Sequence, residues 1–189
     1  MQVILASQSP RRQELLKEIF PSFDIMPQDV KENEQDPDPK ELVKKLALKK
    51  LNNLDQKYKD ALIISADTIV WLNGKLYGKP HTIENAINTL KQLSGTTHFV
   101  YTGVCIAYKG QKHVFVDESR IIFRDLSEEE IIEYVNEKKP LDKAGAYGIQ
   151  DGDMVKGYKG SYSNIVGLPV EKLKEELKVL GVIEWEAFN

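Results

Sequence analysis

Two adjacent arginines near the start of the chain are the first residues whose type and spacing indicate chemistry. Arg11 and Arg12 follow Ser9–Pro10, a pair typical of a helix N-cap and first helical position. Arginine suits bidentate contact with phosphate or carboxylate, and the chain has only four arginines beside 22 lysines. Cations at a helix N-terminus oppose the helix dipole, so an anionic ligand such as phosphate would explain them. The alternative is that both side chains are solvated or pair with a distant carboxylate.

A carboxylate follows the most apolar segment of the sequence. Residues 61–66 form a nearly continuous apolar run, typical of a central strand, and Asp67–Thr68 come next. Ligands of α/β sheets usually bind at the carboxyl ends of central strands, which predicts that Asp67 lies at a binding site. The other interpretation, that Asp67 caps a helix, fits less well. Residues 69–72 continue as a strand into Asn73–Gly74, a hairpin-turn signal.

The remaining charged candidates are Glu32, Lys50 and Lys79. Mg²⁺ prefers one or two carboxylates together with substrate phosphates. Glu32 and Asp67 would then be metal ligands or bases. Lys50 and Lys79 would join the two arginines as phosphate clamps, which gives the set the composition of a polyphosphate site. Taken one at a time, each lysine, and Glu32 in its acidic loop, could instead simply be solvated.

The elements that must position these residues follow from hydrophobic periodicity and from helix-capping signals. Asp38 with Glu41, and Ser127 with Glu130, form capping boxes that predict two helix starts. Residues 143–169 hold six glycines, which indicates either backbone lying close to a ligand or a flexible surface loop. The expected helices cover residues 10–20, 39–54, 82–93, 127–137 and 170–180, and the expected strands cover 3–6, 61–72, 97–108 and 112–123.

Length and composition limit the class of protein. A chain of 189 residues corresponds to one domain with two lobes, here taken as residues 1–189. The net charge of −3 argues against a protein that coats nucleic acid, and no run of 18 apolar residues is present to span a membrane. The single cysteine, Cys105, has alternating apolar neighbours and is expected in the core. One cysteine and no secretory leader pattern predict a cytoplasmic protein.

Eight short segments occur in order along the sequence. They are Leu5-Ala-Ser-Gln-Ser-Pro-Arg-Arg12, Val30-Lys-Glu32, Leu46-Ala47 with Lys50, Ser65-Ala-Asp-Thr68, Gly78-Lys-Pro80, Thr97-His98 with Thr102-Gly103, Lys143-Ala-Gly-Ala-Tyr-Gly-Ile-Gln150 and Val166-Gly-Leu-Pro169. Together they resemble the Maf family of nucleoside triphosphate pyrophosphatases, and the resemblance runs from residue 3 to about residue 180. The acidic segment departs from the family pattern, because Lys31 stands where many relatives have an acidic residue.

The resemblance implies a fold, a reaction and a set of roles. The fold would be the α/β fold of the inosine-triphosphate pyrophosphatases, a long mixed sheet with flanking helices that forms two lobes around a central cleft. The reaction would be hydrolysis between the α- and β-phosphates, and a homodimer is expected by resemblance only. Asp67 would be the general base that activates water, with a divalent metal, Mg²⁺ or Mn²⁺, shared with Glu32. The groups that would hold the triphosphate or line its pocket are Arg12, Lys50, Lys79 and Ser7.

Three positions resemble the branch of the family that hydrolyses dTTP and UTP, namely Arg11, Thr68 and Gln150. The branch that acts on 7-methyl-GTP usually has an aromatic residue at the position of Arg11, a residue other than threonine at that of Thr68, and glutamate at that of Gln150. A neutral amide at Gln150 can donate and accept at once, which suits the carbonyl and N–H of a pyrimidine edge. The alternative activity is 7-methyl-GTP hydrolysis. The alternative from another class is a nucleotide-binding regulator of septum formation without catalysis.

Overall fold

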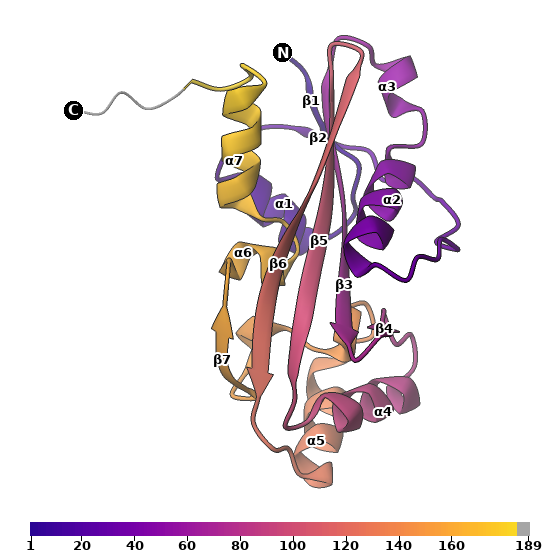
Figure 1. The fold of residues 1–189 in the computed structure, drawn as a ribbon, viewed down its shortest axis with the longest axis vertical. Coiled ribbons are helices and arrows are strands. Elements are labelled where there is room, and N and C mark those ends of the chain that lie inside the picture. The colour runs from indigo at the N-terminus through magenta and orange to yellow at the C-terminus, as the bar shows by residue number, and fades with distance from the viewer. Residues whose placement is uncertain (185–189) are drawn as a thin grey trace, which may run out of the picture.

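A mixed sheet runs the length of the molecule and carries helices on both faces (Figure 1). The computed structural model describes residues 1–184, and the last five residues of the expected domain lie outside this range. Within the described residues the sheet has seven strands in the order β2-β1-β3-β5-β6-β7, with β4 paired to β3. The strands are β1 (Val3–Leu5), β2 (Asp24–Ile25), β3 (Leu62–Leu72), β4 (Lys75–Tyr77), β5 (Thr97–Tyr108), β6 (Gln111–Phe123) and β7 (Val155–Lys159).

Two tight turns build the long antiparallel part of this sheet, as the sequence predicts. Asn73 and Gly74 join β3 to β4, and Lys109 and Gly110 join β5 to β6, all with positive φ. Two successive positive φ values are those of a type I′ turn, whose twist matches that of the strands. The second turn makes β5 and β6 one long hairpin, and β3 pairs antiparallel with β5, so that β3, β5 and β6 are three long neighbouring strands, which Figure 1 shows spanning the molecule.

The five predicted helices begin within one residue of their predicted starts, and three of them end earlier. Two short helices, Leu54–Lys57 and Tyr162–Val166, were not predicted. Ser9 and Ser127 cap their helices through the side chain, and Ser127 forms the expected capping box with Glu130. Asp38 also caps its helix, but by accepting from the Lys40 N–H, and Glu41 pairs with Lys44 instead of completing a capping box. The helices are α1 (Pro10–Leu16), α2 (Pro39–Leu51), α3 (Leu54–Lys57), α4 (Ile83–Leu93), α5 (Glu128–Lys138), α6 (Tyr162–Val166) and α7 (Val170–Val179), with 3₁₀ turns at Ala144–Ala146 and Ile149–Asp151.

The predicted ends of the first two helices, at residues 20 and 54, are wrong. Asn52 and Asn53 both take left-handed backbone conformations, which ends α2 at Leu51 and starts the separate helix α3. Asparagine tolerates this conformation better than most residues. The first helix ends at Leu16 and not at residue 20, and the chain continues in turns.

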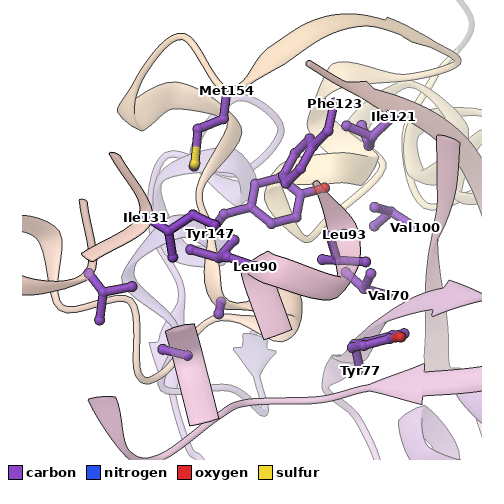
Figure 2. Packing of buried hydrophobic residues seen from close by; sticks show 13 residues of the cluster. Val70, Tyr77, Leu90, Leu93, Val100, Ile121, Phe123, Ile131, Tyr147 and Met154 are labelled. Atoms are coloured by element: carbon purple, nitrogen blue, oxygen red, sulfur yellow. The ribbon is translucent and has the colours of Figure 1, made fainter. Parts of the chain in front are cut away.

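The apolar core fills both faces of the sheet and one end of it. Alternate residues of β3 point to opposite faces, so that Leu62 and Ile64 pack with α1 and α7, while Ile63 packs with α2 beside the buried Cys105. A third cluster lies at the β4 end under α4 and α5, and Figure 2 shows its aromatic centre, Phe123 and Tyr147. The predicted α/β fold with a long mixed sheet and flanking helices is confirmed. None of the helices in residues 1–184 has the length and apolar character needed to cross a membrane.

A gap on one edge of β3 positions the site. β1 pairs with residues 62–64 and β4 pairs with residues 70–72. Between these two pairings, residues 65–69 have β5 as their neighbour within the described sheet and no strand on the other side. Asp67 is therefore in the middle of an 11-residue strand and not at the end of one, because β5 pairs with β3 well past the point where β1 stops.

Candidate active site

A cavity of about 420 Å³ opens at this gap. Its walls come from the segment after β1, the middle of β3, the segment after β4, and residues 142–150 and 165–167. Every candidate residue predicted from the sequence lines it. These residues are Ser7, Arg11, Arg12, Glu32, Lys50, Asp67, Thr68, Lys79 and Gln150.

The α2 face of β3 supplies an ion-pair cluster. The Lys50 ammonium, from the last turn of α2, contacts the Asp67 carboxylate and lies 3.0 Å from Glu32 Oε1. The buried Ser65 hydroxyl donates to the Ala47 carbonyl at 2.7 Å, and this hydrogen bond ties α2 to β3. Lys50 therefore bridges two carboxylates, a role that its expected function as a phosphate clamp did not include.

The two carboxylates have opposite pKa shifts. Burial raises the pKa of the Asp67 carboxyl above its usual range, although Lys50 and Arg12 act against that rise. Burial also acts to raise the pKa of Glu32, but its neighbours Lys50 and Lys79 outweigh it and hold that pKa below the usual range. Environments that separate the pKa values of two nearby acids commonly assign them different roles. Glu32 remains an anion, while Asp67 is the better proton acceptor.

On the opposite face of β3, the Arg12 guanidinium donates three hydrogen bonds, an arrangement called the arginine fork below. Its Nε donates to the Gly167 carbonyl at 2.8 Å, one terminal nitrogen to Ser7 Oγ at 3.3 Å and the other to Thr68 Oγ1 at 3.0 Å. Burial lowers the pKa of the Arg12 guanidinium, with Asp67 and Glu32 acting to raise it. Arg12 thus ties the start of α1, the middle of β3 and the end of α6 together at the cavity wall.

The other candidates lie at the rim. Arg11 Nη1 is 3.7 Å from Asp142 Oδ2, which matches the carboxylate-paired alternative for this residue. Lys79 is exposed and lies near enough to Glu32 to lower its pKa. Gln150 is exposed at the cavity edge, in the second 3₁₀ turn. Lys79 and Gln150 are exposed and Arg11 is partly exposed, although all three line the cavity.

Tyr147 lines the cavity and was not among the predicted site residues, although it stands in one of the quoted segments. Its ring packs on Phe123 with ring centroids 4.7 Å apart, as Figure 2 shows. Its hydroxyl is 2.8 Å from Nε2 of the buried His98. The Thr96 hydroxyl donates to the Leu93 carbonyl at 2.7 Å, so it can only accept from His98 Nδ1 at 3.4 Å. Tyr147 therefore donates to His98, which is neutral, because burial lowers its pKa to about 4.

A second cluster holds the loop that carries Gln150. Asp151 Oδ2 accepts from Lys143 at 2.7 Å and from the Tyr134 hydroxyl at 3.0 Å. The same hydroxyl accepts from the Gly148 N–H at 3.1 Å, and a Cβ at Gly148 would meet Asp151 and Lys143 within 3 Å. Residues 143–151 of the glycine-rich segment are therefore held by side-chain contacts and form part of the cavity wall, and they are not a free loop.

The donor set fits a divalent metal that binds together with a substrate. Among residues 1–184 no group of three or more histidine, cysteine, aspartate or glutamate side chains could hold a metal ion by itself. Asp67 and Glu32 nevertheless converge on one ammonium group, so their oxygens are within reach of a common point. Mg²⁺ characteristically takes one or two carboxylates and completes its shell with phosphate oxygens and water.

Known proteins resemble this chain over nearly its whole length. A relative from Carboxydothermus hydrogenoformans named dTTP/UTP pyrophosphatase is 46% identical over 185 residues, covering 96% of this chain and 100% of the relative. One from Thermococcus kodakarensis with the same name is 42% identical, covering 92% and 95%. The solved Staphylococcus aureus Ham1 protein shares the fold, with a TM-score of 0.59 at 17% identity, covering 95% of this chain and 100% of that one. The Maf-like protein family model matches residues 2–180, and the chain therefore belongs to the Maf family.

Proposed function

We propose that this protein hydrolyses dTTP and UTP to the nucleoside monophosphate and pyrophosphate. The observation that carries the proposal is the cavity itself, because one cavity brings together a buried carboxylate, a bridging lysine and an arginine fork. The relatives named dTTP/UTP pyrophosphatase, at 41% to 46% identity over nearly the whole chain, support the same activity and substrates.

The chemistry follows from what each group can do. Asp67 accepts a proton from the attacking water, which becomes bonded to phosphorus as the α–β phosphoanhydride bond breaks and pyrophosphate leaves. Phosphoryl transfer asks a protein mainly for positioning and charge stabilisation. The cations Lys79, Lys50 and Arg12 would supply these to the triphosphate. Lys50 also holds Asp67 and Glu32 in place before substrate arrives.

A divalent cation, Mg²⁺ or Mn²⁺, belongs to the proposal. Glu32 and Asp67 would hold it, and when bound it supplies positive charge against the triphosphate. The low pKa of Glu32 suits this role, since the carboxylate stays ionised across the physiological range. The proposed compartment is the cytoplasm, from the single buried Cys105, and the proposed assembly is a homodimer.

Release of pyrophosphate from a panel of nucleotides with Mg²⁺ tests the proposal. We expect dTTP and UTP to give the highest kcat/KM, and 7-methyl-GTP to give a much lower value. Preference for 7-methyl-GTP would assign the other branch, and no turnover of any triphosphate would favour a regulator without catalysis. Analytical ultracentrifugation of the same sample tests the homodimer.

The variant Gln150→Glu tests the substrate branch in the same assay. A carboxylate offers acceptors only, so it loses the donor that a pyrimidine carbonyl requires, while the donors of a guanine edge tolerate it. We expect the ratio of kcat/KM for UTP to that for 7-methyl-GTP to fall roughly tenfold or more. The matched control is Gln111→Glu at the distant β5–β6 turn. An unchanged ratio would mean that Gln150 does not read the base.

A further inference from the structure

A buried hydroxyl outside the cavity lining stands behind Thr68. Thr102 lies on β5 directly opposite Thr68 and is fully buried. The two hydroxyl oxygens are 2.9 Å apart, and Thr102 Oγ1 is also 3.1 Å from the Asn164 carbonyl oxygen. Each threonine hydroxyl has one proton to donate, so the direction of each hydrogen bond can be worked out.

The Asn164 carbonyl fixes the first direction. Asn164 lies in the short helix α6, and the last carbonyls of a helix have no partner within it. The N–H groups of Gly167 and Leu168 both donate to the Ser163 carbonyl, and Thr102 donates to that of Asn164. Since this bond uses the only proton of Thr102, its oxygen must accept from Thr68.

Thr68 is therefore left with acceptor capacity alone. Its proton goes to Thr102, and one lone pair accepts from Arg12 Nη2 at 3.0 Å. The other possible acceptor for its proton, the Gly167 carbonyl, is farther away at 3.5 Å. Thr68 lines the cavity, so a bound molecule meets a hydroxyl oxygen that can accept a hydrogen bond but cannot donate one.

We propose that Thr102 is a positioning residue that makes Thr68 a hydrogen-bond acceptor, so that Thr68 selects a donor on the nucleoside. This inference rests on the proposed function. The donor is either the N3–H of uracil or thymine or the 3′-hydroxyl of the sugar, both of which dTTP and UTP carry. Phosphate oxygens are excluded as partners of Thr68, because two acceptors repel.

Substrate analogues test the acceptor role in the parent protein. N3-methyl-UTP lacks the base donor, and 3′-deoxy-UTP lacks the sugar donor. We expect one of them to have kcat/KM lowered roughly tenfold relative to UTP, which identifies the donor. If neither analogue differs from UTP by more than about twofold, the inference is overturned.

Two variants test the part of Thr102. Thr102→Val keeps the shape and removes the hydroxyl, which releases the Thr68 proton, whereas Thr102→Ser keeps the hydroxyl. We expect Thr102→Val to lower kcat/KM for UTP while leaving that for the discriminated analogue nearly unchanged, so that their ratio falls toward one. We expect Thr102→Ser to restore the parental ratio to within about threefold. If Thr102 had a purely structural role, Thr102→Val would lower kcat/KM for UTP and for the analogue by the same factor, and that result would overturn the inference.

The design separates failure of the inference from failure of the proposed function. A parent protein that hydrolyses neither dTTP nor UTP overturns the proposed function and the inference with it. A parent that hydrolyses UTP without discriminating the analogues overturns the inference alone. If Thr102→Val does not fold, Thr68→Val measures the same ratio in its place, and persistence of the discrimination in that variant would count against the inference.

Discussion

Asp67 is the residue on which turnover should depend most. Replacing it with asparagine keeps its volume and removes the carboxylate that is proposed to accept the proton, while Lys50 retains Glu32 as a partner. We expect Asp67→Asn to lower kcat by about 100-fold or more, with a melting temperature close to that of the parent. Pyrophosphate release and thermal unfolding measure the two quantities. Asp60→Asn, at an exposed position, is the matched control, and turnover within about threefold of the parent would remove Asp67 as the base.

Arg12 should matter for stability as well as for activity. A lysine ammonium cannot reproduce the three-way contact with Gly167, Ser7 and Thr68. We expect Arg12→Lys to lower the free energy of unfolding by about 1–3 kcal/mol and to reduce kcat/KM for both substrates. Urea unfolding and steady-state kinetics check this. The exposed Arg120→Lys serves as control, and parental values for Arg12→Lys would show that the fork does not stabilise the site.

The identity of the charged residues could be predicted from the sequence, and their pairing could not. Arginine at a helix start and aspartate after an apolar run are local signals, and both residues line the cavity. The Lys50 bridge depends on how α2 packs on β3, and the proposed acceptor role of Thr68 depends on the Asn164 carbonyl, in a helix nearly 100 residues away. Such contacts come from tertiary packing, which periodicity does not encode.

At the scale of elements, helix starts were predicted well because a capping side chain marks four of the five predicted starts, at Ser9, Asp38, Thr82 and Ser127. Their ends were predicted less well, because Asn52 is compatible with both a helix and a left-handed cap, and packing decides between them. The apolar run stops before Asp67, although residues 69–72 were expected to continue as a strand. The strand continues because β5 offers backbone partners up to Trp71, whatever the polarity of the side chains.

The contact between α5 and the loop 143–151 should affect binding more than chemistry. Tyr134 on α5 donates to Asp151 and accepts from Gly148, so Tyr134→Phe removes both hydrogen bonds while keeping the ring. We expect the free energy of unfolding to fall by about 1–2 kcal/mol and KM for UTP to rise several-fold with little change in kcat. The exposed Tyr158→Phe is the control. A fall in kcat at constant KM would contradict a role limited to holding the loop.

For the molecule as a whole, His98 predicts how stability depends on pH. Its pKa is about 4 in the folded protein and about 6.5 when exposed, so below pH 6.5 the unfolded chain binds a proton that the folded chain does not. The free energy of unfolding should therefore fall as the pH is lowered from 6.5 to 4, by about 3 kcal/mol in total from this group.

Urea unfolding between pH 7.5 and pH 4.5 measures this dependence. We expect His98→Gln to be less stable than the parent at pH 7.5 but to lose less stability on acidification. His81→Asn, an exposed position whose positive φ asparagine tolerates, should keep the parental slope. If the free energy of unfolding depends on pH equally in the parent and in His98→Gln, protonation of His98 does not cause the loss of stability in acid.

The hydrogen bond from Arg12 to Gly167 joins residues 155 positions apart, nearly the two ends of the described chain. Closing so long a loop carries a large entropic cost, and contacts of this kind form after local hairpins such as β5–β6. A ribosome that has released only the first 160 residues has made the sheet and the carboxylates but not the acceptor that orients Arg12. The cavity should therefore be completed at the end of synthesis, and a nascent or truncated chain should leave the cell's nucleotides untouched.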